Sequence, residues 1–315
     1  MPQTGDLILH HYDEAPFAEK VRLVFGIKDL AWHSVIQPAA LPKPDLIPLT
    51  GGYRRTPVLQ IGADIFCDTQ LIIAEIERLY PLPSVFPDGN PGLALALGSW
   101  AHGPYVVTSV ALYMGAADPF AGDINLPSHF FEDRKKMWMT QFDTEQLKAK
   151  LPGYRTRLRA HTDFLNQQLA DGRAFLTGDR PGLVDLHALW NPWFLRRFAP
   201  AEARWAYDPY PQIAAWEARL DRIGHGTRQE MAPAQALDIA RQSIPLPACG
   251  VSPDDPLAID AGTPVVVTPS DYAQVPVTGT LVGTTVQSVS IRREDPRVGE
   301  VVVHFPKIGY EIVRS

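Results

Sequence analysis

The chain has 315 residues, of which 29 are basic and 35 acidic, so its formal net charge is −6 and its pI about 5.8. Hydrophobic residues make up 45% and charged residues 20%, which excludes a disordered or fibrous chain. The acidic balance argues against a nucleic-acid-binding surface, which would need a basic patch or stripe. The two cysteines lack disulfide or zinc-type spacing, no segment is typical of a signal peptide, and no apolar run is long enough to span a membrane. We therefore expect a cytoplasmic protein that binds neither nucleic acid nor membrane and holds no metal.

The first 80 residues alternate between strand-like and helix-like patterns. Strands are expected at 7–12, 32–37, 57–61 and 64–67, and helices at 17–26 and 69–80. The order β-α-β-loop-β-β-α predicts a mixed sheet with helical cover.

The rest of the chain consists of a linker followed by two regions of different composition. Residues 81–92 are rich in proline, glycine and aspartate and form a linker. Helices are expected at 92–115, 128–148, 153–171, 183–198, 209–223 and 232–242, with Gly153 among the breaks. After Pro245, valine, threonine, proline and glycine dominate, and strands are expected at 263–268, 285–293, 300–305 and 310–313. The sequence thus predicts an α/β domain over 1–82, an all-α helical domain over 92–243 and a small all-β C-terminal module over 245–315.

Three motifs stand where predicted elements begin. Arg55-Thr56-Pro57-Val58-Leu59 opens a strand, and Asp68-Thr69 precedes the helix at 69–80. In Gly178-Asp179-Arg180-Pro181-Gly182-Leu183-Val184-Asp185, the aspartate stands at the third helical position and can accept from the N-cap amide, although Gly182 replaces the usual serine or threonine. With the order of elements, these motifs resemble the cytosolic glutathione transferase family over about residues 7–240. The β module lies outside the family's usual pattern.

The resemblance implies a thioredoxin-like N-terminal domain that binds glutathione as a co-substrate. It implies that Pro57 is cis and that the main chain of Thr56 pairs with the extended tripeptide at an open sheet edge. Amides at the helix start, with the Thr69 hydroxyl, would bind the γ-glutamyl carboxylate, and Asp68 would accept from the ligand's ammonium or act as a plain N-cap. Arg55 would reach the glycyl carboxylate or remain solvated.

The expected catalytic position departs from the family. Related proteins carry serine or cysteine just before the Pro-aromatic pair, whereas this chain has Ala15 before Pro16 and Phe17. A glutathione thiolate needs a hydrogen-bond donor or a helix N-terminus to lower its pKa. Tyr12 is the candidate catalytic hydroxyl. His11 and the main-chain amides near the helix start are the alternative donors. A packed, non-catalytic role stays open for both Tyr12 and His11.

The first long helix of the helical domain carries Trp100, His102 and Tyr105, which form either a hydrophobic substrate pocket or core. The resemblance favours a homodimeric glutathione transferase-like enzyme that adds the thiol to a hydrophobic electrophile, by conjugation or a related elimination or isomerisation. Two alternatives remain: a non-catalytic ligand-binding or regulatory protein on the same scaffold, and an assembly module that docks through the β tail.

Overall fold

The N-terminal region has the predicted thioredoxin-like arrangement. The computed structural model describes residues 6–115, 126–137 and 144–315. Strand β1 runs parallel to β2 and antiparallel to β3, which in turn is antiparallel to β4. The elements in this region are β1 (Ile8–His11), α1 (Pro16–Ile27), β2 (Ala31–Ile36), the short α2 (Ile47–Thr50), β3 (Val58–Ile61), β4 (Asp64–Cys67) and α3 (Thr69–Leu79).

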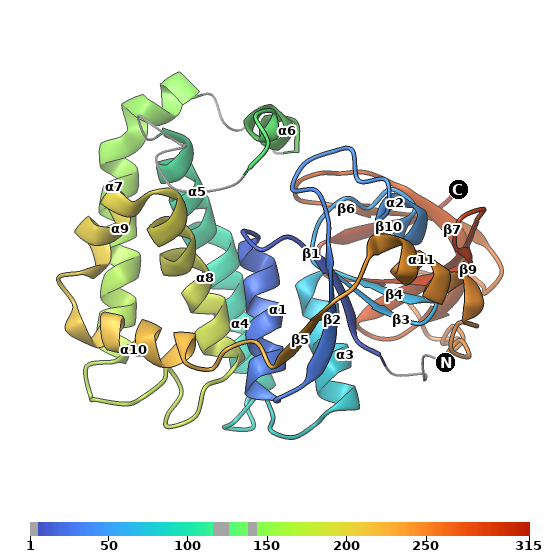
Figure 1. Cartoon of the computed structure of the whole chain (residues 1–315), viewed down its shortest axis with the longest axis horizontal. Helices are drawn as coiled ribbons and strands as arrows, with labels where there is room; N and C mark the ends of the chain where they lie inside the picture. Colours follow the sequence, from blue (N-terminus) through green and yellow to red (C-terminus); the bar gives the residue numbers. More distant parts are fainter. Residues whose placement is uncertain (1–5, 116–125, 138–143) are drawn as a thin grey trace.

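Helices form a separate layer beside this sheet, and α1 lies between the two (Figure 1). The first long helix contains a π-helical turn at Pro104, which lacks the N–H that a regular turn would use. The helical elements are α4 (Pro91–Trp100), η1 (Ala101–Tyr105), α5 (Val106–Gly115), α6 (Phe130–Met137), α7 (Thr144–Gln168), α8 (Leu183–Phe198), α9 (Pro200–Tyr207) and α10 (Pro211–Asp221).

Two helical boundaries differ from the prediction. The expected break at Gly153 is wrong, because α7 continues through Pro152 and Gly153 while packing along α5. Of the helix expected at 128–148, the structure has α6 and the start of α7, and residues 138–143 lie outside the described part of the chain. Helix α9 was not anticipated.

The C-terminal strands continue the N-terminal sheet. The sheet has ten strands in the order β10-β6-β7-β8-β9-β4-β3-β1-β2-β5, and β9 pairs in parallel with β4. At the opposite edge, β5 pairs with β2, so residues 227–242 pack on the sheet. The elements in this region are β5 (Thr227–Glu230), α11 (Pro233–Gln242), β6 (Pro264–Pro269), β7 (Val277–Thr284), β8 (Ser288–Asp295), β9 (Gly299–Pro306) and β10 (Tyr310–Arg314).

One expected strand is divided differently in the structure. The segment expected at 285–293 begins with a turn, closed by the Thr285 amide donating to the Ser288 carbonyl at 2.9 Å. The turn joins β7, which the sequence did not predict, to β8.

A polar cluster ties the two parts of the sheet together at the β4–β9 junction. His304 on β9 pairs through Nε2 with Asp64 Oδ1 at 2.9 Å, and its Nδ1 lies 2.8 Å from the Ser290 hydroxyl. The second carboxylate oxygen of Asp64 accepts from the Leu246 amide at 2.8 Å. The buried carboxylate is thus satisfied by groups from two C-terminal segments, and Ser290 on β8 holds the histidine ring.

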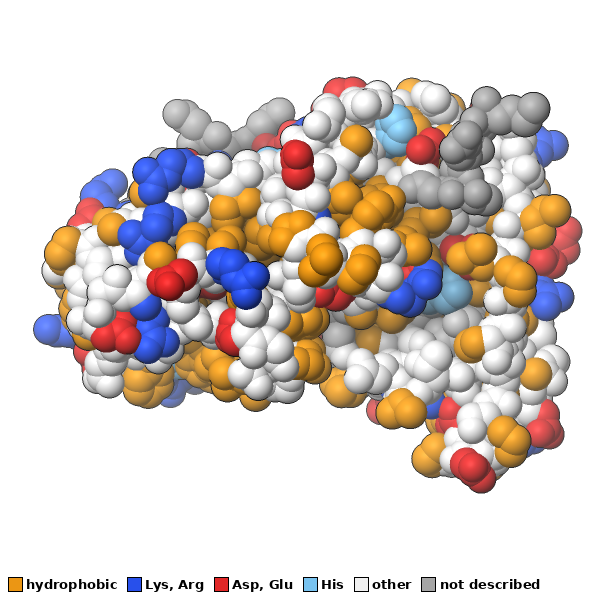
Figure 2. Space-filling model, turned by 90° about the horizontal axis from the view of Figure 1, so that it is seen from below, with side chains coloured by type: hydrophobic (Ala, Val, Ile, Leu, Met, Phe, Trp, Pro, Cys, Tyr) orange, Lys and Arg blue, Asp and Glu red, His pale blue; other side chains and the backbone are white. Residues whose placement is uncertain are grey.

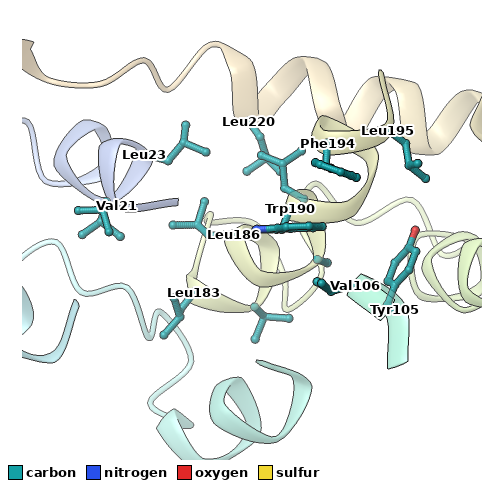
Figure 3. Close-up of a cluster of buried hydrophobic side chains, with 14 of the residues drawn as sticks. Val21, Leu23, Tyr105, Val106, Leu183, Leu186, Trp190, Phe194, Leu195 and Leu220 are labelled. Carbon is teal, nitrogen blue, oxygen red and sulfur yellow. The ribbon is translucent and has the colours of Figure 1, made fainter. Parts of the chain in front are cut away.

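Among the described residues, the two largest hydrophobic cores lie on opposite faces of the sheet. The larger joins α1 and α3 to the helical layer, with α8 at its centre: Leu186, Trp190 and Phe194 of α8 lie among side chains from α1, α5 and α10 (Figure 3). The smaller core lies under the C-terminal strands, α2 and α11.

The outer surface mixes side-chain types. In Figure 2, hydrophobic side chains gather across the middle of the face, with acidic and basic ones scattered around them. Within the described ranges, no helix combines the length and apolar character needed to cross a bilayer.

Candidate functional site

Five residues expected to bind the tripeptide line one cavity of about 290 Å³, here called the Asp68 cavity. They come from the loop before β3 and from the junction of β4 and α3, which the β3–β4 hairpin brings together. These residues are Arg55, Thr56, Pro57, Asp68 and Thr69. The structure therefore gathers the whole predicted binding set at one place.

The start of α3 forms one end of this cavity. Asp68 adopts a φ of 73° and a ψ of 138°, a strained backbone conformation that residues with a side chain rarely occupy. Its Oδ1 accepts from the Gln70 amide at 3.0 Å. Its Oδ2 accepts from the Tyr310 hydroxyl at 3.3 Å. Asp68 thus caps the helix with one oxygen and leaves the other within reach of a ligand beside Tyr310.

The main chain of Thr56 forms the middle of the cavity. The Thr56–Pro57 bond is cis, which confirms the prediction, and β3 begins at Val58. Across the described residues, no hydrogen bond reaches the amide or carbonyl of Thr56. This peptide group is free to pair with an extended ligand in the manner of an added strand.

Arg55 closes the cavity together with the loop between β6 and β7. Its Nη1 donates to Asp271 Oδ2 at 3.3 Å, and its guanidinium lies 3.8 Å from the centre of the Tyr272 ring. It also donates to the Tyr272 carbonyl. Arg55 is therefore already held by the C-terminal region.

A second cavity, of about 110 Å³, adjoins the first across Phe17, Thr56 and Tyr272; we call it the Tyr12 cavity. Ala15 and Pro16, at the start of α1, also line it. Helix α1 has no side-chain N-cap, and no described group accepts from the amides of Phe17 or Ala18. Its positive end is thus available to a negative charge.

Tyr12 also lines this second cavity. Burial raises the pKa of Tyr12, with Glu14 and Asp133 adding to the rise and Arg134 opposing it. The phenol consequently stays protonated at neutral pH and can donate a hydrogen bond.

His11 lies in the core. Its Nε2 lies 3.1 Å from the Ser34 hydroxyl, and its Nδ1 accepts from Arg22 at 3.0 Å. Burial, with Arg22 and Arg228, lowers the pKa of His11 to about 3, so the ring is neutral and already hydrogen-bonded. His11 does not line either cavity.

The three aromatic candidates on the first long helix occupy different places. His102 lines the Asp68 cavity. Tyr105 is fully buried and its hydroxyl lies 2.8 Å from that of Tyr207, so it packs in the core. Trp100 lines a different cavity in the helical layer, with its indole donating to His161 at 3.1 Å. The structure therefore does not bring Trp100 or Tyr105 to the site.

A third cavity, of about 620 Å³, continues from Asp68 and Thr69 towards Lys20 and His187. Burial lowers the pKa of Lys20 to about 7 and that of His187 well below its usual range. The larger cavity therefore contains groups that are neutral or partly neutral at physiological pH.

Sequence reasoning missed the C-terminal contribution to the site. Asp271, Tyr272 and Tyr310 reach Arg55 and Asp68 only because β9 pairs with β4, a contact across more than 200 residues. A polar-aromatic pair in a loop carries no signal of this pairing. In the described ranges, no cluster of three histidine, cysteine or acidic side chains is suited to a metal ion.

Comparison with known proteins gives two domain matches. Residues 9–84 match the glutathione S-transferase N-terminal domain, and residues 119–228 match a domain family of unknown function. No curated protein matches the chain.

Solved structures extend the likeness over the whole chain. A GST-like protein from Pseudomonas syringae is 34% identical, with a TM-score of 0.76, over 98% of this chain and 99% of that one, so the match includes the C-terminal strands. A glutathione S-transferase from Rhodospirillum rubrum (20% identity, TM-score 0.51) matches over 68% of this chain and 87% of its own. FzlA from C. crescentus (20% identity, TM-score 0.52) matches over 69% and 88%, and these two show a similar fold. The chain belongs to the glutathione transferase family.

Proposed function

We propose that this protein binds reduced glutathione in the Asp68 cavity and adds its thiol to a hydrophobic electrophile. The observation that carries the proposal is the gathering of Arg55, Thr56, Pro57, Asp68 and Thr69 around one cavity, with an unpaired peptide group at Thr56. An extended peptide pairs with such a group through its own main chain.

The proposed pose follows from the charges at the ends of the cavity. The γ-glutamyl carboxylate lies at the start of α3, where the Thr69 hydroxyl and the helix dipole favour an anion. The neighbouring ammonium donates to Asp68 Oδ2, next to the Tyr310 hydroxyl. The cysteinyl main chain pairs with Thr56, and Arg55 marks the glycyl end.

This pose directs the thiol to the boundary between the two cavities. The unpaired amides at the start of α1 and the Tyr12 hydroxyl stabilise the thiolate there, because donors and a helix N-terminus both favour S⁻. The electrophile occupies the Tyr12 cavity, whose far wall is aromatic. Catalysis would then consist of positioning together with thiolate stabilisation, without a serine or cysteine at position 15.

Ala15 supports a second candidate, a non-catalytic glutathione-binding protein. Alanine offers no hydroxyl to the sulfur, and Tyr12 then serves only as cavity wall. The two candidates differ in the ionisation of bound glutathione and not in its affinity.

Ultraviolet difference spectroscopy distinguishes them, because a thiolate absorbs near 240 nm and a thiol does not. For an enzyme, titration of the complex with pH should give a thiol pKa at least about one unit below the free value of roughly 8.5, together with turnover of 1-chloro-2,4-dinitrobenzene. Bound glutathione with an unshifted pKa and no turnover would reject the transferase and leave the binding protein.

We also propose that two copies of the chain associate. Leu93 and Leu95 on α4 and Val107 on α5 are exposed, at 50%, 40% and 43%. Large apolar side chains on adjoining helices favour an interface. Light scattering should give the wild-type protein twice the chain mass of 34.9 kDa, whereas Leu95→Asp should have the mass of one chain. A monomeric wild-type protein would refute the proposal.

A further inference from the structure

A buried lysine that has no hydrogen-bond or ion-pair partner among the described residues lines the Tyr12 cavity. Lys43 is 2% exposed, and its Nζ lies 5.7 Å from the centre of the Tyr12 ring. Among the described residues, no hydrogen bond or ion pair reaches Nζ. Because an isolated buried charge is costly, an unpaired ammonium at a cavity wall indicates that its counter-ion is a ligand.

The charges around Lys43 leave a positive excess. Arg54 and Arg134 line the same cavity. Asp133 pairs with Arg54, and Glu14 is the acidic side chain among the lining residues. Arg55, the fourth cation of the lining, pairs with Asp271. Four cations therefore stand against three carboxylates, two of which are engaged by Arg54 and Arg55.

Neutral donors add to this excess. The Tyr113 hydroxyl and the Trp190 indole N–H are buried without a hydrogen-bond partner in the described structure, and both residues line the cavity. Buried donors of this kind are normally satisfied, so the cavity offers several hydrogen-bond donors at once.

The remaining wall is aromatic and limits the size of the ligand. Trp190, Phe194 and Phe198 form a stacked row, with centroid separations of 4.9 and 4.8 Å. A volume of about 110 Å³ is somewhat below the roughly 150 Å³ of an apolar cavity that holds benzene. The cavity alone therefore encloses a carboxylate with a short chain, and a single ring fits only by extending into the adjoining Asp68 cavity.

We propose that the Tyr12 cavity binds a small carboxylate with an apolar body, a single ring or a short chain, and that its carboxylate pairs with Lys43. As a substrate class this rests on the proposed function: the acid would carry an activated double bond. The thiolate would form a C–S bond at one carbon of that double bond, and the neighbouring carbon would take up the thiol proton. As a binding site it stands on the cavity alone.

The protonation of Lys43 supports this assignment. Burial, with Arg134 and Arg54, lowers the pKa of Lys43 to about 7, while Asp133 opposes the shift. Glu14 and Tyr12 face the same space. An anion in contact with the ammonium would raise this pKa, so binding at pH 8 should take up a proton.

The test compares two probes of the same shape. Wild-type protein without glutathione is titrated by calorimetry with 4-nitrobenzoate and with 4-nitrobenzamide. The carboxylate should bind about ten- to a hundred-fold more tightly, the range expected of a hydrogen bond to a charged group. Equal affinities, or no binding of either probe, would overturn the proposal.

Variants then assign the preference to one side chain. Lys43→Met should abolish the preference for the carboxylate while still binding the amide, and Lys43→Arg should retain part of it. Lys150→Met, at an exposed position, is the control and should behave as the wild type. A preference that survives in Lys43→Met would contradict the proposal. If Lys43→Met does not fold, the wild-type comparison of the two probes still tests for an acid-binding cavity, and Lys43→Arg tests the role of Lys43.

A separate glutathione titration distinguishes the two proposals. If Lys43→Met loses affinity for glutathione and keeps its preference for nitrobenzoate, Lys43 serves the tripeptide's own carboxylate and the inference is wrong. If wild-type protein binds nitrobenzoate and not glutathione, the acid site stands and the proposed transferase function fails.

Discussion

Asp185 should be a major determinant of stability in the helical layer. It is fully buried, and its carboxylate accepts from the Leu176 amide at 2.8 Å, the Gly182 amide at 3.0 Å and the Trp216 indole at 2.8 Å. Asp185→Ala leaves three buried donors without an acceptor. At roughly 1–3 kcal/mol for each, the free energy of unfolding should fall by at least about 3 kcal/mol.

Urea denaturation followed by far-ultraviolet circular dichroism measures this loss. Asp179→Ala is the matched control, because Asp179 is exposed in the same loop and should change stability by less than about 0.5 kcal/mol. A loss below about 1 kcal/mol in Asp185→Ala would refute the inference that these three bonds hold the start of α8.

The same residue predicts a pH dependence. Burial raises the pKa of Asp185 from 3.8 to about 6, although its three donors oppose the shift. Since the pKa is higher in the folded state, protonation of Asp185 increases the free energy of unfolding. This contribution is complete below about pH 4 and is lost as the pH rises through about 6. The shift corresponds to about 3 kcal/mol. The difference in unfolding free energy between the wild type and Asp185→Asn should change over this window, and a constant difference would contradict the assignment.

Three further substitutions test separate parts of the structure. Tyr12→Phe should raise the pKa of the bound thiol by about one unit and change glutathione affinity less than three-fold, by ultraviolet titration and calorimetry; an unchanged thiol pKa would remove Tyr12 from the mechanism. Gly226→Ala should destabilise by at least about 1 kcal/mol, because its φ is +65° and a Cβ would lie 2.3 Å from the Leu30 carbonyl oxygen; equal thermal stability would contradict this. His304→Phe should speed hydrogen exchange at the Val302 amide, which donates to the Ala63 carbonyl at 3.0 Å across the β4–β9 junction. Unchanged protection of this amide would show that the polar cluster does not stabilise the junction.

The fold could be predicted where a local pattern determines it. Apolar periodicity located α1, α3 and α8, and the β-prone segments located β1 to β4. Polar β5 has no such pattern, because its structure comes from pairing with the edge of β2. Likewise, Pro152 and Gly153 favour a break, but packing of α7 against α5 overrides this local preference.

The candidate site likewise contains residues that local motifs predict and residues that only the folded structure brings together. Thr56, Pro57, Asp68 and Thr69 belong to short motifs at element boundaries, so their position in the sequence carried the information. The contribution of Tyr310 depends on parallel pairing between distant strands, which no local pattern encodes.

Calorimetric titration with reduced glutathione, comparing the wild type with Asp68→Asn, tests the central claim most directly. Asparagine can still accept from the Gln70 amide, so the start of α3 is preserved while the charge facing the ligand's ammonium is removed. Asp254→Asn, at an exposed position, is the control. We predict saturable binding in the wild type and the control, weakened about ten-fold or more in Asp68→Asn. No binding at millimolar glutathione by a folded wild-type protein, or equal affinity in Asp68→Asn, would contradict the assignment of this cavity to the tripeptide.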